Sequence, residues 1–157
     1  MSGAEQLQAV DLTKLNITQL SKLKRQVEKE LSILQNSLRR LKMAQNKFQG
    51  SKANLDKITP ASKGKQIIVP LTASIFVPGR LSDVDKVLLE IGTGYYVEKD
   101  LDGARDYFKR KIAFVTEQME KIQAVGVEKS KIREVLVDAI RMKINQKTAN
   151  PQTQAAS

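Results

Sequence analysis

The feature that most constrains this chain is a spacing of four and three residues that recurs from Leu20 to Leu55. Eight of the eleven positions are apolar, and three polar residues interrupt them. The positions are Leu20, Lys24, Val27, Leu31, Leu34, Leu38, Leu41, Gln45, Phe48, Lys52 and Leu55. A 3.5-residue repeat of this length is typical of a coiled coil rather than of an ordinary surface helix. We therefore predict a long coiled-coil helix within residues 12–58, an arm on the order of 60 Å.

Local signals mark the two ends of this predicted helix. Asn16 can accept a hydrogen bond from the first-turn backbone, and Gln19 stands where the second half of a capping box is expected. Leu15 can pack on Leu20 as a hydrophobic staple. Pro60 and the polar residues after it end the helical pattern.

The middle of the chain, residues 66–98, has the pattern of β-strands. It is rich in Ile, Val, Phe and Tyr and is interrupted by turn residues. We expect strands near 66–70, 72–77, 86–91 and 95–98, joined in hairpins.

Two pairs of residues are interpreted as the turns of these hairpins. Pro78 and Gly79 suit the central positions of a type II turn, because proline sets φ and glycine accepts a positive φ. Gly92 and Gly94 can supply the positive φ values of a tight hairpin turn. A phosphate-binding loop is disfavoured at Gly92 and Gly94, since a strand rather than a helix follows and Val97 occupies the place of a third glycine.

A second long helix is predicted over residues 100–148. Asp100 can cap it, and its seam of apolar residues shifts phase near Gly126, a slip that locally alters a supercoil. The polar segment 149–157 lacks periodicity and is predicted to be a disordered tail. Residues 1–157 thus form one predicted α+β domain, in which two long helices make an antiparallel coiled-coil hairpin around the strands.

The strand segment carries more apolar residues than such a connection needs. Four short strands cannot bury both faces of a sheet by themselves, and sheets of few strands are marginal alone. We therefore expect the strands to pack against other chains.

Composition narrows the classes of function. The chain has no histidine and no cysteine, so the commonest general base, the commonest metal ligand and thiolate chemistry are missing. We expect no catalytic site, no metal and no cofactor. No apolar run approaches the roughly 18 residues that span a membrane, and the first residues lack a signal-peptide core. A cytoplasmic protein with no membrane partner is expected, and a nuclear location is left open.

The net charge of +10 raises the question of a nucleic-acid partner. The lysines and arginines are spread along both predicted helices and alternate with acidic residues. A nucleic-acid-binding protein would gather them on one face or combine them with aromatic platforms. Nucleic acid is therefore a disfavoured partner. The positive charge fits either the solvated exterior of a coiled coil or complementarity to acidic clients or neighbouring subunits.

Three stretches carry a resemblance to a known family. "VPLTASIFVPGRL", "VLLEIGTGYYVEKD" and "ARDYFKRKI", set between two coiled-coil helices, resemble the alpha class of prefoldin across residues 12–148. The resemblance implies a hetero-hexamer of two alpha-class and four beta-class subunits. Their β-hairpins would form an inter-subunit β-barrel platform that carries the coiled coils as tentacles. The resemblance also implies an ATP-independent co-chaperone that holds unfolded proteins, such as actin and tubulin, and passes them to the cytosolic chaperonin.

This resemblance assigns roles to two sets of residues. The predicted subunit interface on the hairpins consists of Ile67, Ile68, Val69, Leu71, Ile75, Phe76, Val77, Leu88, Ile91, Tyr95, Tyr96 and Val97. A partly frayed pair of helices would expose seam residues at its open end. The predicted client-binding tip consists of Leu15, Ile17, Leu20, Leu23, Leu136, Ile140 and Ile144. Leucine at seam spacing is normally core, so for each tip residue an ordinary packing role remains an equal alternative.

A second interpretation belongs to another class of protein. The chain could be a coiled-coil scaffold or a transcriptional regulator that binds one partner helix. Two hairpins between the helices favour the co-chaperone, because a scaffold has no need of them. Suppressed aggregation of unrelated unfolded proteins would separate the two.

Overall fold

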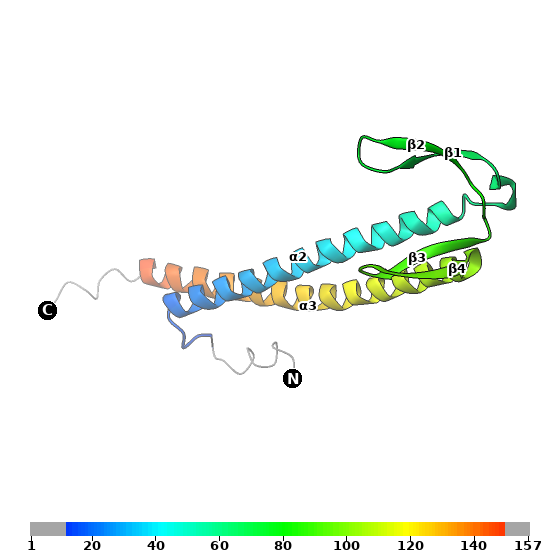
Figure 1. Ribbon diagram of the computed structural model, residues 1–157. Coiled ribbons are helices and arrows are strands. Elements are labelled where there is room, and N and C mark those ends of the chain that lie inside the picture. The colour runs from blue at the N-terminus through cyan, green and yellow to red at the C-terminus, as the bar shows by residue number, and fades with distance from the viewer. Residues whose placement is uncertain (1–11, 150–157) are drawn as a thin grey trace. The chain divides into compact units, whose positions relative to one another are not determined.

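A computed structural model of the chain describes residues 12–149 (Figure 1). The elements follow in the order α2 (Ile17–Leu55), the short 3-10 helix η1 (Pro60–Ser62), β1 (Gln66–Pro70), β2 (Phe76–Arg80), β3 (Lys86–Gly92), β4 (Tyr95–Asp100) and α3 (Leu101–Ala149). Contacts divide the described chain into two units. Residues 12–41 and 118–149 form the helical unit, and residues 42–117 form the hairpin unit. The two hairpins between two long helices confirm the predicted fold class.

The start of α2 has the predicted capping box. The backbone N–H of Gln19 donates to Asn16 Oδ1 at 2.8 Å, and the N–H of Asn16 donates to Gln19 Oε1 at 2.9 Å. All eleven positions of the 4–3 seam are buried or half-buried, as a coiled-coil pattern predicts. The helix is shorter than the predicted 12–58 at both ends. It stops at Leu55 because the chain tightens into turn hydrogen bonds there, such as Ile58 N–H to Leu55 O at 3.0 Å.

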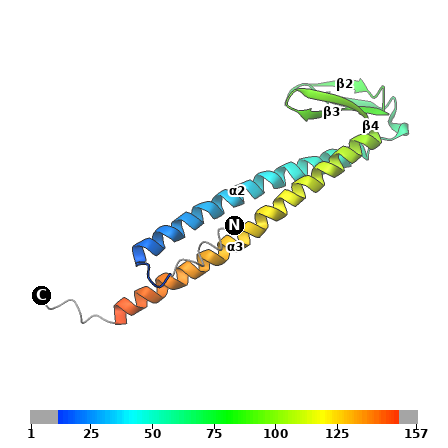
Figure 2. The ribbon, with the colours of Figure 1, turned by 90° about the horizontal axis from the view of Figure 1, so that it is seen from below.

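Within the helical unit, the two helical segments pack side by side and run in opposite directions (Figure 2). The core consists of Leu20, Val27, Leu31 and Leu136. Lys129 stands at a seam position of α3 and binds Glu30 on α2, with 2.7 Å between Nζ and Oε2. Burial of these apolar side chains is the main source of stability for this unit.

The same antiparallel packing holds within the hairpin unit. Phe48 on α2 and Phe108 on α3 have ring centroids 6.2 Å apart, and Arg105 Nε lies 3.0 Å from Asp56 Oδ1. Gln45, a polar seam residue, is 8% exposed and donates from Nε2 to Thr116 Oγ1 at 2.7 Å. A buried amide with hydrogen-bond partners is tolerated in such a seam and favours one alignment of the helices.

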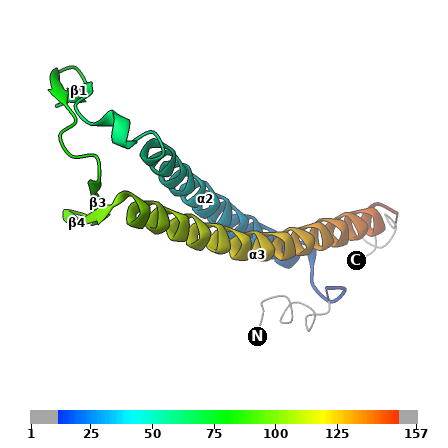
Figure 3. The same cartoon turned by 90° about the vertical axis from the view of Figure 1, so that its right-hand side faces the viewer.

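The strands form two separate antiparallel hairpins, β1–β2 and β3–β4. Their register pairs Val69 with Val77 in the first and Leu89 with Val97 in the second. Figure 3 shows β3 and β4 next to the start of α3, whereas β1 lies farther from that helix. An apolar cluster that includes Leu55, Leu89 and Ala104 joins the second hairpin to both helices.

The predicted turn at Pro78 and Gly79 is wrong. Both residues lie in β2, where they pair with Ile68 and Ile67. Proline is tolerated there because each strand of a two-stranded sheet has a free edge on which no N–H is needed. The chain reverses instead at residues 71–75, where Leu71 N–H donates to Ile75 O at 2.9 Å. The second strand accordingly covers 76–80 rather than 72–77.

The predicted hairpin turn at the Gly-Thr-Gly run is confirmed for one of its two glycines. Gly94 has φ +77°, whereas Gly92 lies at the end of β3 and has no positive φ. The pairing register shifts between Glu90 and Gly92, so that one residue of β3 next to the turn has no partner on β4.

α3 begins with the predicted cap. Asp100 Oδ1 accepts the backbone N–H of Gly103 at 3.0 Å. The helix runs without interruption through Gly126 and ends at Ala149. The rest of the predicted tail, residues 150–157, lies outside the described residues.

Candidate functional site

Most of the exposed large apolar side chains of the hairpin unit lie on its two hairpins. We call this set the hairpin surface. It consists of Ile68, Val69, Leu71, Ile75, Phe76, Val77, Leu88, Ile91, Tyr95 and Tyr96. These ten belong to the predicted interface set, and the other two members, Ile67 and Val97, are half-buried. Leu71 and Ile75 lie in the loop that joins β1 to β2.

The first hairpin exposes apolar residues on both of its faces. Side chains alternate between faces along a strand, so Ile68 and Val69 lie on opposite sides of β1. They are 73% and 37% exposed. Gly79 of β2 adds no side chain to the face that carries Val69, and a Cβ there would lie 3.4 Å from Val69 Cγ2. Within residues 12–149, neither face of β1–β2 is fully covered by another part of the chain.

The second hairpin differs, because one of its faces is already packed. Val87 and Leu89 contact the apolar cluster of the unit, and Leu89 is 6% exposed. The other face carries Leu88, 70% exposed, near an ion pair in which Lys86 Nζ lies 2.8 Å from Glu98 Oε1. The hydrogen bond that Lys86 donates to the Glu98 carboxylate, together with the charge of that carboxylate, raises the pKa of Lys86 above its ordinary value.

A surface of this kind is suited to bind protein strands. Contiguous exposed apolar residues mark interaction sites, and strands at a sheet edge present unpaired backbone groups that another chain can pair with. The hairpins can therefore add to the sheets of other chains and bury both the apolar faces and the edges.

The predicted client-binding tip in the helical unit divides into three groups. Leu20 and Leu136 are core residues, 0% and 1% exposed. Leu15, Leu23 and Ile140 are half-buried and pack against that core, and Ile17 is also half-buried. Ile144 is 47% exposed.

We expected fraying to expose seam residues in this part of the helices. This expectation is wrong for Leu20 and Leu136, which are buried in the described structure. The two helices close on each other as in any antiparallel seam, which buries the leucines that face the partner helix. Of the seven predicted tip residues, Ile144 is the one whose side chain is open to solvent.

Sequence reasoning missed two exposed apolar residues in the same part of α3. Val135 is 54% exposed and Met142 is 63% exposed. Both lie off the seam, and an apolar residue off the seam was the signal that could have identified them. Methionine adapts its shape to varied partners, so this surface suits loosely defined ligands.

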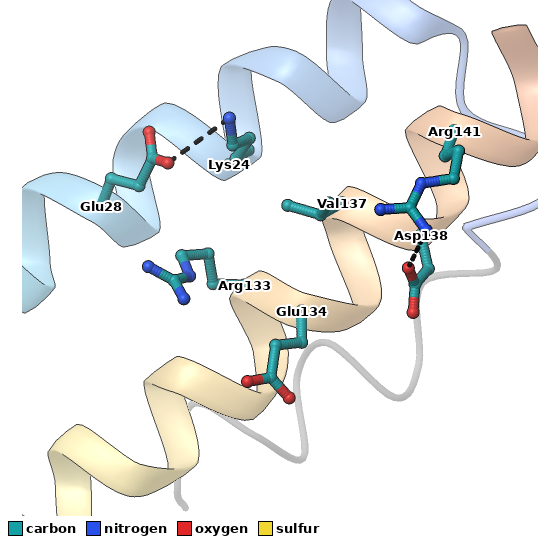
Figure 4. A pocket seen from close by; sticks show the side chains of 7 residues that line it. All are labelled: Lys24, Glu28, Arg133, Glu134, Val137, Asp138 and Arg141. Atoms are coloured by element: carbon teal, nitrogen blue, oxygen red, sulfur yellow. Dashed lines mark ion pairs between the residues drawn. The ribbon is translucent and has the colours of Figure 1, made fainter.

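A charged groove lies between the helices near these residues (Figure 4). Its volume is about 480 Å³, and it is lined by Lys24, Glu28, Arg133, Glu134, Val137, Asp138 and Arg141. Arg133 and Val137 reach from α3 towards α2. The cations and carboxylates balance, and two ion pairs, Lys24–Glu28 at 3.4 Å and Arg141–Asp138 at 3.9 Å, neutralise most of them. The groove therefore favours neither an anion nor a cation.

The described residues hold no group of three or more metal-ligating Asp or Glu side chains. Across residues 12–149, neither long helix has an apolar stretch able to cross a membrane.

The chain is similar to known proteins over most of its length. Residues 27–146 match the family described as "Prefoldin subunit". Human prefoldin subunit 5 is 43% identical over 150 residues, which cover 96% of this chain and 97% of the relative. The mouse protein of that name is 44% identical over 148 residues, covering 94% and 96%.

A solved structure shows a similar fold. A chain of a filamentous PFD from Methanocaldococcus jannaschii superposes with a TM-score of 0.64 at 20% identity. The similarity covers 74% of this chain and 97% of that chain. At this identity the likeness concerns the fold alone.

Proposed function

This chain belongs to the prefoldin family, and from that premise we propose that it is one subunit of a hetero-hexameric, ATP-independent co-chaperone. The complex holds unfolded proteins, such as actin and tubulin, and delivers them to the cytosolic chaperonin. Its other subunits are alpha-class and beta-class prefoldins, and it acts in the cytoplasm. The chain contributes binding rather than catalysis and uses no cofactor.

The observation that carries the proposal is the hairpin surface. A chain that leaves both faces of β1–β2 uncovered and one face of β3–β4 free must bury them elsewhere to be stable in water. Closure of several hairpins into a barrel removes the free edges as well. We assign the hairpin surface to assembly with neighbouring subunits.

Client binding is assigned to three exposed apolar residues near the end of α3 in the helical unit, Val135, Met142 and Ile144. Each contact is weak, about 1.5–3 kcal/mol when fully buried. Several subunits acting on one client would supply avidity, while partial contacts allow fast release.

The assembly half of the proposal is tested by the mass in solution of this chain, alone and mixed with beta-class prefoldin subunits. We expect the mixture to give a hexamer that contains this chain. A monomer or simple dimer that ignores those subunits would contradict the proposal and favour a coiled-coil scaffold.

The client-binding half is tested in the assembled complex with Ile144→Ser. We expect unchanged hexamer mass and weaker suppression of the aggregation of chemically unfolded actin. Ile33→Ser is the matched control, because Ile33 is 63% exposed in the same unit but is outside the proposed client-binding set. Equal effects of both variants would refute the assignment of clients to Ile144.

A further inference from the structure

A second exposed surface of the hairpin unit lies on α3 itself. Tyr107, Arg110, Lys111 and Phe114 line a shallow pocket of about 250 Å³. Phe114 is 58% exposed, although its neighbour Val115 is 6% exposed in the helix seam. We call these four residues the aromatic–cationic patch.

The patch is continuous with the part of the unit that carries the hairpins. Tyr107 packs against the apolar cluster that includes Leu89 of β3, and its ring lies edge-on to Phe108 with centroids 5.4 Å apart. An isolated exposed phenylalanine would need no explanation. An exposed phenylalanine in a pocket that adjoins an uncovered hairpin indicates that one interface extends over both.

The patch is also positively charged. Arg110 Nε lies 2.9 Å from Asp106 Oδ2, which neutralises that cation. The ammonium of Lys111 lies 5.5 Å from the centre of the Tyr107 ring, and within residues 12–149 it has no carboxylate partner. A cation held beside an aromatic surface suits a ligand that offers a carboxylate next to an apolar side chain.

We infer that the aromatic–cationic patch docks an acidic, apolar-containing segment of a neighbouring prefoldin subunit, which would extend the proposed hairpin interface onto α3. The inference rests on the proposed function. A subunit is preferred over a client because the patch lies in the hairpin unit, whereas the proposed client residues lie in the helical unit. The net charge of +10 also favours acidic neighbours in assembly.

Site-specific photo-crosslinking identifies the occupant directly. Phe114→p-benzoylphenylalanine keeps a bulky aromatic group at the patch, and irradiation of the assembled hexamer with bound unfolded actin should join residue 114 to a neighbouring subunit. The crosslinked peptide should contain Asp or Glu. Crosslinks to actin, or to no protein at all, would overturn the inference.

Two substitutions measure the contribution of the patch to assembly. Phe114→Ser should raise the dissociation constant for the neighbouring subunits about tenfold, since the buried ring is lost. Lys111→Glu should also raise this dissociation constant. It should make assembly less sensitive to salt, because an attractive charge pair becomes repulsive. Wild-type affinity and salt dependence in both variants would contradict the inference.

Matched controls separate this result from misfolding and from failure of the proposed function. Val127→Ser and Lys131→Glu change exposed residues of the same helix away from the patch, and they should leave assembly unchanged. Circular dichroism should show equal helix content in all variants. If the wild-type chain does not assemble with prefoldin subunits, the proposed function fails first. If the wild type assembles and the patch variants match it, the docking inference alone fails.

Discussion

At the scale of single residues, polar side chains in the apolar seam decide how α2 and α3 align with each other. Gln45 accepts a hydrogen bond from Lys42 Nζ at 2.9 Å and donates one to Thr116 at 2.7 Å. Thr116 in turn donates to the carbonyl of Ile112 at 2.8 Å. A shifted pairing of the helices would bury the Gln45 amide without Thr116, and a buried polar group without a partner is costly.

Gln45→Ala should therefore lower the free energy of unfolding by about 1–2 kcal/mol, through lost hydrogen bonds and lost packing. Thermal or urea unfolding followed by circular dichroism measures this. Gln49→Ala, an exposed glutamine on the same helix, is the control and should have little effect. A Gln45→Ala chain as stable as the Gln49→Ala chain would show that the network contributes nothing.

The ion pair between Glu30 and Lys129 predicts a dependence of stability on pH. The hydrogen bond from Lys129 lowers the pKa of Glu30 below its ordinary value of 4.5. A carboxyl group with a lowered pKa in the folded state stabilises the fold above its unfolded pKa, and this stabilisation is lost as the pH falls through the folded pKa. We expect Glu30→Gln to destabilise at pH 7 and to reduce the loss of stability below about pH 4.5.

Unfolding of wild type and Glu30→Gln across pH 3–7 checks this expectation, because the two curves should converge at acid pH. Glu30 is more than a third exposed, so solvent screening keeps the difference small. Parallel curves over the whole range would show that the pair does not contribute.

At the scale of elements, backbone conformation decides what each glycine and proline does. Pro78 and Gly79 looked like a turn because both favour one, yet they pair within β2. Gly94 does form a turn, with φ +77°. Composition indicates that a segment turns somewhere, whereas strand pairing decides where.

Gly94→Ala should destabilise the second hairpin by about 1 kcal/mol, because a side chain is strained at positive φ. Gly92→Ala should be tolerated, since Gly92 has no positive φ and a Cβ there would meet Tyr95 Cδ2 at an ordinary 3.9 Å. Hydrogen exchange of the β3 and β4 amides compares the two variants. Equal protection in both would mean that positive φ is not the constraint.

At the scale of the whole molecule, the chain has more apolar surface exposed on its hairpins than it can bury alone. The isolated chain should bind an apolar dye such as ANS and associate with itself at raised concentration. Dye fluorescence should fall when beta-class prefoldin subunits are added, because the hairpin surface becomes covered. Fluorescence that is low from the start, or unchanged by the partners, would contradict the proposed role of that surface.

The sequence by itself determined the elements and their periodicity. The 4–3 seam, the Asn16 and Asp100 caps and the two hairpins depend on local spacing and short-range hydrogen bonds, which a single stretch of chain contains. The tertiary structure decided exposure. Leu20 and Ile144 look equivalent as seam residues, yet one is 0% exposed and the other 47%. Likewise, an apolar strand residue such as Leu89 or Leu88 becomes core or surface according to which face of the hairpin meets α3, because burial depends on what a distant part of the chain brings alongside.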